Sequence, residues 1–258
     1  MLIRSIFLGI IQGLTEFLPV SSSGHLVIFQ SLLGFQKARL TIGVFLHFGT
    51  LIPVVIIFRK DIYELIKLTK AKRHLLWLII IGSIPTAFIG VVLEDFFKGL
   101  FDSVIITGFM LLITGGLLFI AEKYGSSTRS IKEFRGINAV LVGLVQGLAI
   151  IPGISRSGST IVASLLQGLE REEAARYSFL LSIPVIGGAG LLELKDLLST
   201  GMVGIDALSL IAGTLTAALS GYFAIRYLLH VLHRGSLIIF SYYCFIVGTV
   251  IILSAGLF

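Results

Sequence analysis

Long apolar stretches alternate with short polar connections along this chain. A helix that crosses a membrane needs about 17–25 predominantly apolar residues. Charge-free runs of this class predict spanning helices at residues 40–58, 74–93, 103–121, 207–225 and 235–258. A shorter run over residues 177–192 predicts one more span. The pattern indicates an all-α, polytopic membrane protein.

Two further apolar segments, residues 1–35 and 136–168, are interrupted near their middles. The first contains QGLTEFLPVSSSGH at residues 12–25, and the second contains QGLAIIPGISRSGST at residues 146–160. Hydroxyl, Gly and Pro residues open the helical backbone, which lipid cannot hydrogen-bond. Such stretches persist where they are buried in protein or line a wet cavity. We therefore expect each segment to be a re-entrant hairpin of two half-helices.

The two interrupted segments are related to each other by a shift of 134 residues. The shift superposes identical residues at Gly9/Gly143, Gln12/Gln146, Gly13/Gly147, Leu14/Leu148, Ser21/Ser155, Ser23/Ser157, Gly24/Gly158 and Gly34/Gly168. We predict one membrane domain made of two repeats, about residues 1–125 and 136–258, each with one re-entrant hairpin and three spans. Because three spans cross the membrane and a hairpin does not, the second repeat is expected to be inverted.

Composition and charge agree with a membrane location and orient the chain. Hydrophobic residues make up 56% and charged residues 13% of the sequence, whereas soluble domains carry about 25% charged residues. The net charge of +6 comes from Lys and Arg gathered mostly in the connections 59–74, 122–136 and 231–234. Basic loops face the cytoplasm, so we expect both termini outside and no nucleic-acid partner. Cys244 is the one cysteine, which excludes an internal disulfide.

Ionisable and hydroxyl side chains converge if the two hairpin tips meet. They comprise one carboxylate, one imidazole and one guanidinium, from Glu16, His25 and Arg156. Half-helices starting after Ser23–Gly24 and after Gly158 would add the positive ends of their dipoles. Arginine, clustered donors and helix N-termini describe an oxyanion site, and phosphate fits best. Because the surroundings are apolar, we expect the phosphate to belong to a lipid.

The stretches QGLTEFLPVSSSGHL and PGISRSGSTI resemble the two signature motifs of the undecaprenyl-diphosphatase family, of the bacitracin-resistance type. The resemblance covers essentially the whole chain. It implies hydrolysis of undecaprenyl diphosphate to undecaprenyl phosphate, which recycles the carrier lipid for peptidoglycan synthesis and gives bacitracin resistance. It also implies a bacterial inner-membrane location, a site open to the periplasmic side, and a divalent cation, Mg²⁺ or Ca²⁺.

The resemblance also assigns residues to the site. The family's Glu/Gln-x-x-x-Glu motif falls on Gln12 and Glu16, so this chain has one carboxylate where the family can have two. The family's Ser and His fall on Ser22 and His25. The second motif places its Ser, Arg, Ser and Thr on Ser155, Arg156, Ser157 and Thr160.

From these residues we expect a catalytic group and a substrate-binding group. Arg156 would grip the diphosphate. His25 would either attack phosphorus or take the proton of Ser22, which then attacks; the sequence leaves both open. Glu16 would orient His25 or, with Gln12, ligate the cation. Substrate contacts are expected from Gln12, Ser21, Ser155, Ser157, Thr160, Gly153 and Gly158.

Plainer interpretations compete with these roles. Glu16 and Arg156 could pair only to hold the repeats together, and His25 could be a buried core histidine. His47 is interpreted as a packing residue. A secondary transporter or lipid flippase is the competing function, because inverted repeats with broken helices are typical of transporters. A nucleophile beside a base favours the enzyme. A homodimer is among the expectations for assembly.

Overall fold

The structure, a computed structural model, describes residues 1–258 except 36–37, 102, 126–127, 201–203 and 255–258. The side chains at positions 200 and 234 are also outside the description. The described residues are helical apart from connections and one isolated bridge between Arg129 and Leu169. The predicted all-α class is confirmed.

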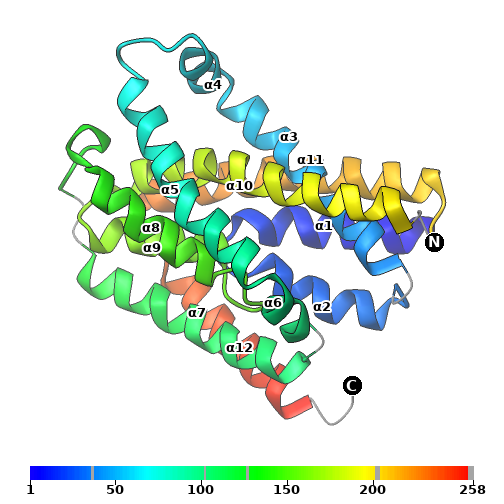
Figure 1. The fold of residues 1–258 in the computed structure, drawn as a ribbon. Helices are drawn as coiled ribbons and strands as arrows, with labels where there is room; N and C mark the ends of the chain where they lie inside the picture. The colour runs from blue at the N-terminus through cyan, green and yellow to red at the C-terminus, as the bar shows by residue number, and fades with distance from the viewer. Residues whose placement is uncertain (36–37, 102, 126–127, 201–203, 255–258) are drawn as a thin grey trace.

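The helices follow one another with short connections (Figure 1). They are α1 (Leu2–Phe17), α2 (Ser22–Leu32), α3 (Arg39–Ile57), α4 (Arg59–Ile66), α5 (Arg73–Val92), α6 (Glu94–Leu100), α7 (Val104–Tyr124), the 3₁₀ turn η2 (Ile131–Glu133), α8 (Gly136–Leu148), α9 (Arg156–Leu166), α10 (Arg171–Thr200), α11 (Ala207–Arg234) and α12 (Ile238–Ser254).

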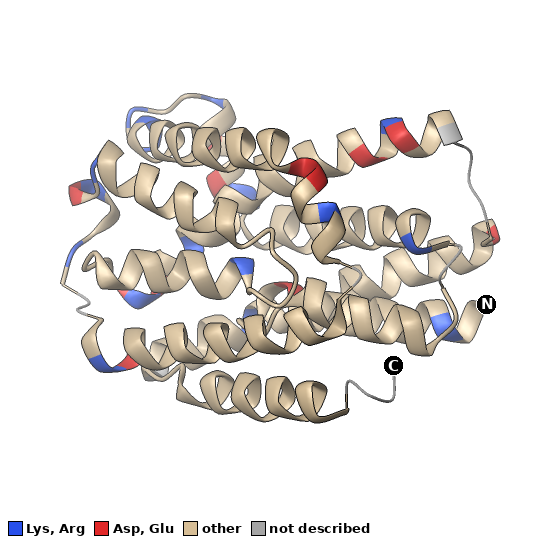
Figure 2. Ribbon diagram, turned by 60° about the horizontal axis from the view of Figure 1, so that its bottom comes forward, with Lys and Arg blue, Asp and Glu red and all other residues tan. Residues whose placement is uncertain are grey.

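Five of the described helices, α3, α5, α7, α10 and α11, are long and apolar enough to cross a membrane. The predicted run 235–258 forms the shorter apolar helix α12, of 17 residues, and positions 255–258 lie outside the described residues. Figure 2 shows most charged positions at helix ends and connections, with uncharged helix middles between them. The chain is a multi-pass membrane protein.

Both interrupted segments fold as two helices separated by a turn, α1 and α2 in the first and α8 and α9 in the second. The helices after the turns begin earlier than predicted, at Ser22 and Arg156. The predicted starts after Ser23–Gly24 and Gly158 are therefore wrong. The physical reason is capping, because a serine side chain that accepts a first-turn N–H favours a helix start just after it.

Close helix contacts fix where the two broken segments lie. α1 packs along α11, and α8 packs along α5. A Cβ atom at Gly9 would overlap the carbonyl oxygen of Gly213, and one at Gly143 would overlap the carbonyl oxygen of Gly82. Only glycine permits this approach of two helix backbones in a membrane. The outward faces instead carry exposed apolar side chains such as Phe88, which is 67% exposed.

Candidate active site

The two turns touch, and this contact brings the polar residues of both segments together. Ser157 Oγ, at the start of α9, donates a hydrogen bond to the carbonyl of Leu18 at 3.3 Å. A Cβ atom at Gly24 would lie 3.2 Å from the Cα of Gly153, so the backbones are in near contact. A side chain at Gly24 would press on the second turn, and one at Gly153 would overlap the carbonyl oxygen of Thr107 on α7.

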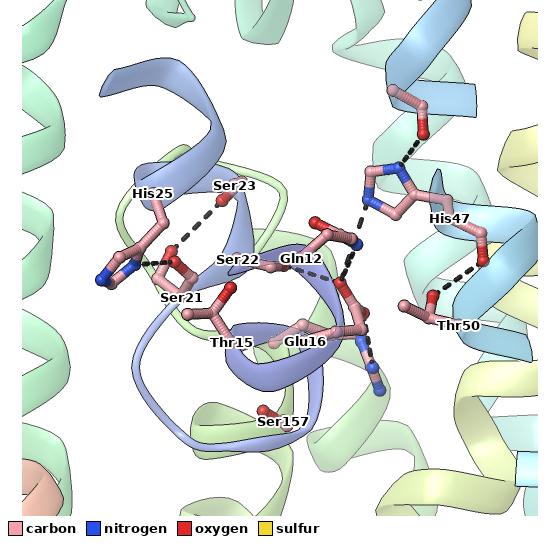
Figure 3. A network of polar contacts seen from close by, with 12 residues as sticks. Gln12, Thr15, Glu16, Ser21, Ser22, Ser23, His25, His47, Thr50 and Ser157 are labelled. Atoms are coloured by element: carbon pink, nitrogen blue, oxygen red, sulfur yellow. Dashed lines mark hydrogen bonds and ion pairs between the residues drawn. The ribbon is translucent and has the colours of Figure 1, made fainter. Parts of the chain in front are cut away.

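Glu16, on the last turn of α1, is the centre of the polar cluster (Figure 3). Its Oε1 accepts a hydrogen bond from Arg156 Nη2 at 2.8 Å. Its Oε2 accepts from Gln12 Nε2 at 2.9 Å and from Ser22 Oγ at 2.6 Å. The carboxylate thus joins α1, α2 and α9. A hydroxyl donating to a carboxylate is the arrangement of a nucleophile beside its base.

The charges of Glu16 and Arg156 balance each other, and one guanidinium nitrogen is left without a partner in the described part of the chain. The Glu16 side chain is 5% exposed and the Arg156 side chain 13%. A charge buried to this extent is stable only when it is paired and hydrogen-bonded. Arg156 Nη1 is buried and has no hydrogen-bond partner in the described part of the chain. A buried guanidinium N–H without an acceptor gives an incoming oxyanion a charge-assisted bond.

His47, on α3, also faces Glu16 (Figure 3). Its Nε2 lies 3.9 Å from Glu16 Oε2, and its Nδ1 lies 2.8 Å from the carbonyl oxygen of Gly43. A carbonyl only accepts, so Nδ1 donates to it. The interpretation of His47 as a packing residue overlooked this proximity. Nothing in the spacing of the sequence relates residue 47 to residue 16, because tertiary packing of α3 against α1 creates the approach.

His25 points away from Glu16, on the other side of the start of α2 (Figure 3). Its Nδ1 lies 2.7 Å from the carbonyl oxygen of Ser21, and its Nε2 lies 2.8 Å from the hydroxyl of Tyr243. With Nδ1 donating to the carbonyl, Nε2 is the acceptor for the Tyr243 hydroxyl. The rings are stacked, with centroids 5.8 Å apart. The expected contacts of His25 with Ser22 and Glu16 are therefore replaced by contacts with Ser21 and Tyr243.

Tyr243, on α12, is a site residue that sequence reasoning missed. It lies 218 positions from His25 in the sequence and is embedded in an apolar run. The only local signal is a phenol in that run, since a tyrosine in an apolar setting usually places its hydroxyl against a polar partner. The Tyr243 side chain itself is 41% exposed.

Two serines cap the helices that begin at the site. Ser21 Oγ accepts from the N–H of Gly24 at 3.2 Å, and Ser155 Oγ accepts from the N–H of Gly158 at 3.1 Å. The N–H of Gly158, which was expected to donate to the substrate, therefore donates to Ser155 instead. Ser21 has φ of 70°, in the left-handed region that non-glycine residues rarely adopt. Such a strained residue in a tight turn is frequent at functional sites.

Thr160 and Gly153, both predicted substrate contacts, form hydrogen bonds with the second turn and with the helices beside it. Thr160 Oγ1 lies 2.9 Å from the carbonyl oxygen of Arg156 and 2.6 Å from Ser178 Oγ. Gly153 has φ of 98°, and its carbonyl accepts from Thr114 Oγ1 at 2.9 Å. In this geometry both residues hold the backbone that carries Arg156.

The protein groups alone form an incomplete site for a divalent cation. The described residues contain no group of three or more His, Cys, Asp and Glu arranged to hold a metal. Both oxygens of Glu16 already accept hydrogen bonds. Gln12 Oε1, in contrast, is buried and unpartnered in the described part of the chain. One neutral oxygen is therefore available beside one occupied carboxylate.

Comparisons with known proteins identify the family of the chain. Residues 5–250 match the sequence model of a family described as bacitracin resistance protein BacA. An undecaprenyl-diphosphatase of Halothermothrix orenii is 62% identical over 255 residues, covering 99% of this chain and 98% of that protein. Relatives of the same name from Carboxydothermus hydrogenoformans and Methanosphaera stadtmanae are 46% and 42% identical, each over 98% of this chain and 97% of the relative. The chain belongs to the bacitracin resistance protein BacA family.

Proposed function

We propose that this protein is a membrane-embedded phosphatase that hydrolyses undecaprenyl diphosphate to undecaprenyl phosphate and inorganic phosphate. Family membership and the names of its relatives support the reaction. One structural observation carries the proposal, the chain of contacts from Ser22 through Glu16 to Arg156. A nucleophile, a base and a phosphate-binding cation are linked there across two segments of the sequence.

Substrate binding is proposed to begin with competition at Arg156. In the resting site the carboxylate of Glu16 occupies Nη2 of Arg156, and Nη1 is unpartnered. A diphosphate would take Nη1 first and then share the guanidinium in a bidentate contact. The positive N-terminal ends of α2 and α9 add to the attraction. Glu16, partly released from Arg156, becomes a stronger base toward Ser22.

The chemical step follows from the contact between Ser22 and Glu16. Ser22 Oγ attacks the terminal phosphorus while its proton passes to Glu16 Oε2. The bond between phosphorus and the bridging oxygen breaks, and the prenyl monophosphate leaves with that electron pair. Water then hydrolyses the phosphoserine and releases inorganic phosphate. Arg156 neutralises the charge that builds on the departing oxygen, a contact typically worth 10²–10³ in rate.

His25 is the alternative nucleophile. Its Nε2 carries the lone pair when Nδ1 donates to Ser21, and in the resting site that lone pair accepts the Tyr243 hydroxyl. Ser22 is favoured because its hydroxyl already has a carboxylate base at 2.6 Å. His47, 3.9 Å from Glu16, is proposed to hold that carboxylate in place from the side of α3.

A divalent cation, Mg²⁺ or Ca²⁺, is proposed to be bound jointly by the protein and the diphosphate. Glu16, through the oxygen that Arg156 releases to the diphosphate, and Gln12 Oε1 would be its protein ligands, and Mg²⁺ commonly uses one or two carboxylates with substrate phosphates. The cation would neutralise charge on the diphosphate oxygens. Gln12 is suited to this part because its free oxygen is neutral and adds no repulsion toward Glu16.

We also propose an inverted repeat with re-entrant hairpins, both termini outside and the site open to the periplasmic side of a bacterial inner membrane. The helix pairs support the repeat, because α1 of the first half packs on α11 of the second and α8 of the second packs on α5 of the first. The reaction would recycle carrier lipid for cell-wall biogenesis and confer bacitracin resistance. A homodimer stays a prediction. Cysteines placed at position 132 should react with an impermeant thiol reagent only from the cytoplasmic side.

Phosphate release from farnesyl or undecaprenyl diphosphate by the purified protein in detergent tests the reaction. We expect release with Mg²⁺ or Ca²⁺ and its loss with chelator. Ser22→Ala should abolish release if Ser22 is the nucleophile, and trapping with acid should yield phosphoserine in the parent. Retained activity in Ser22→Ala, with phosphohistidine in the parent after trapping with base, would move the nucleophile to His25. A folded parent without release under any cation would contradict the enzyme.

A further inference from the structure

A cavity of about 500 Å³ lies away from the candidate active site, where α3 ends, α4 and α10 begin, and α11 nears its end. Its described lining contains no residue of that site. Four cationic side chains line it, those of Arg59, Lys60, Arg176 and Arg226. Cations gathered from three different helices around one hollow are the first sign of an anion site.

The carboxylate in the cavity wall, Asp61, is already neutralised. Lys72 Nζ lies 2.7 Å from Asp61 Oδ1, and Arg176 Nε donates to Asp61 Oδ2 at 3.0 Å. Within the described part of the chain, no carboxylate lies at ion-pair distance from Arg59, Lys60 or Arg226. The cavity therefore keeps a net positive charge, with donors available to a ligand.

The ring of Tyr222 orients the guanidinium N–H groups of Arg226, which can then donate to a phosphate. The Arg226 guanidinium carbon lies 5.8 Å from the centroid of the Tyr222 ring. A guanidinium over an aromatic ring is restrained while its N–H groups stay free at the edge. Arginine presents these N–H groups in the fork that matches phosphate oxygens bidentately. Several cations around one position suit a phosphate better than a carboxylate.

The rest of the wall is apolar, which indicates a ligand with an apolar part. Ile57 and Leu229 line the cavity, and neighbouring Ile56 is 45% exposed. Phe223, next to Tyr222 on α11, is 58% exposed and belongs to the outward apolar surface. The ends of membrane-spanning helices lie at the depth of lipid headgroups, where basic pockets between helices hold anionic lipids.

We infer that this cavity binds the phosphate headgroup of an anionic phospholipid, with its acyl chains along the outward faces of α3 and α11. The lipid would contact α4, α10 and α11 from the surrounding bilayer. This role lies beyond the proposed hydrolysis, since none of the cavity residues takes part in that reaction. A free phosphate is also an anion but lacks the chains that the apolar wall would contact.

Native mass spectrometry of the delipidated full chain tests the inference, with phosphatidylglycerol or phosphatidylcholine added at increasing concentration. We expect tighter binding of phosphatidylglycerol. Lys60→Gln/Arg226→Gln should weaken it about 30-fold, since each basic residue near an anionic lipid contributes about one factor of five. Lys70→Gln/Lys132→Gln, which removes two exposed charges outside the cavity, is the matched control and should bind as the parent does. Thermal unfolding in detergent shows whether each variant is folded.

Three results would overturn the inference. The first is equal affinity of the parent for the two lipids. The second is an equal loss in the control variant, which would reduce the effect to net charge. The third is displacement of bound phosphatidylglycerol by inorganic phosphate at the same concentration, which would make the occupant a free anion. Because the readout is lipid binding, these results are independent of whether the protein releases phosphate.

Discussion

The two broken segments share one local geometry and differ in the residues that carry chemistry. In the first, Ser21 caps α2 through Gly24 and its hydroxyl lies 3.2 Å from that of Ser23. In the second, Ser155 caps α9 through Gly158. The matching hydroxyl pair, Ser155 and Ser157, is 3.3 Å apart. Residues 134 positions apart thus make the same contacts.

Two of the superposed positions that differ set the chemistry of the Glu16–Arg156 cluster. Glu16 in the first segment corresponds to Ile150 in the second, and Ser22 corresponds to Arg156. The first segment therefore supplies the carboxylate and the hydroxyl, whereas the second supplies the guanidinium that pairs with the carboxylate. Two segments with the same local geometry and different residues at matched positions thus bring a carboxylate and a guanidinium to 2.8 Å from each other, and neither segment holds the whole cluster.

The largest expected effect comes from removing the contribution of the second segment. Arg156→Gln should lower kcat by about 10²–10³, because it removes the charge that stabilises the transition state. It also leaves Glu16 buried and unpaired, a change that typically destabilises by about 3–5 kcal/mol. Phosphate release and thermal unfolding measure the two effects separately.

A double variant separates catalysis from stability at this pair. Glu16→Gln/Arg156→Gln should regain much of the lost stability, because no uncompensated charge is left, and should stay inactive. Arg135→Gln, an exposed arginine just before α8, is the matched control. If the double variant recovered phosphate release, Arg156 and Glu16 would be a structural pair only.

The two segments can also be compared through their helix contacts, α1 with α11 and α8 with α5. Gly9→Ala and Gly143→Ala each place a methyl against a glycine carbonyl of the partner helix. Both should destabilise by about 1–3 kcal/mol, the usual cost of overpacking. Gly116→Ala on α7 is the control, since a Cβ there meets nothing within 4 Å. Thermal unfolding in detergent checks the three. A loss at one glycine alone would show that the two contacts are not equivalent.

The features of this architecture that could be predicted depend on residues close together in the sequence. Apolar runs indicated the spanning helices, and the polar interruptions indicated the two turns. The pairing of Glu16 with Arg156 was accessible because each is the ionisable residue of its motif in an apolar setting. The helix starts were misplaced by ignoring serine capping at Ser21 and Ser155.

The parts that could not be predicted depend on which distant helix faces a residue. His25 was expected to meet Ser22, but the carbonyl of Ser21 and the hydroxyl of Tyr243 fix its ring elsewhere. His47 reaches Glu16 only because α3 packs beside α1. Neither contact has a spacing or a motif, so tertiary packing alone reveals both.

The contact between His25 and Tyr243 is a further difference between the two segments, because the second segment has no equivalent contact among the described residues. The residues matched to His25 and Tyr243 are Ser159 and Phe109, and Ser159 Oγ has no partner in the described part of the chain. Tyr243→Phe removes the hydrogen bond that holds the ring of His25, worth roughly 1 kcal/mol, and should lower kcat about fivefold where His25 takes part in the transition state and leave kcat unchanged where Ser22 and Glu16 alone do. Tyr242→Phe, at a 56% exposed side chain, should leave phosphate release unchanged. Equal rates for the two variants would remove Tyr243 from the site.

A second carboxylate–guanidinium pair, Asp61 with Arg176, shows what an ion pair does without a nucleophile beside it. Burial raises the pKa of Asp61, but the hydrogen bonds and charges of Lys72 and Arg176 outweigh it and hold that pKa below its usual value. A carboxyl with a depressed folded-state pKa stabilises the fold above its unfolded value of about 3.9 and loses this contribution as pH falls further.

Asp61→Asn should therefore lower the unfolding temperature slightly at neutral pH and leave a smaller drop than the parent shows on acidification to about pH 3. The effect should be the smallest of this series, because the Arg176 side chain is 42% exposed and water screens the pair. Glu64→Gln, on the same helix and without an ion-pair partner among the described residues, should follow the parent. Identical pH profiles for the parent and Asp61→Asn would show that the pair adds no stability. Unchanged phosphate release in Asp61→Asn would show that the Asp61–Arg176 pair takes no part in catalysis.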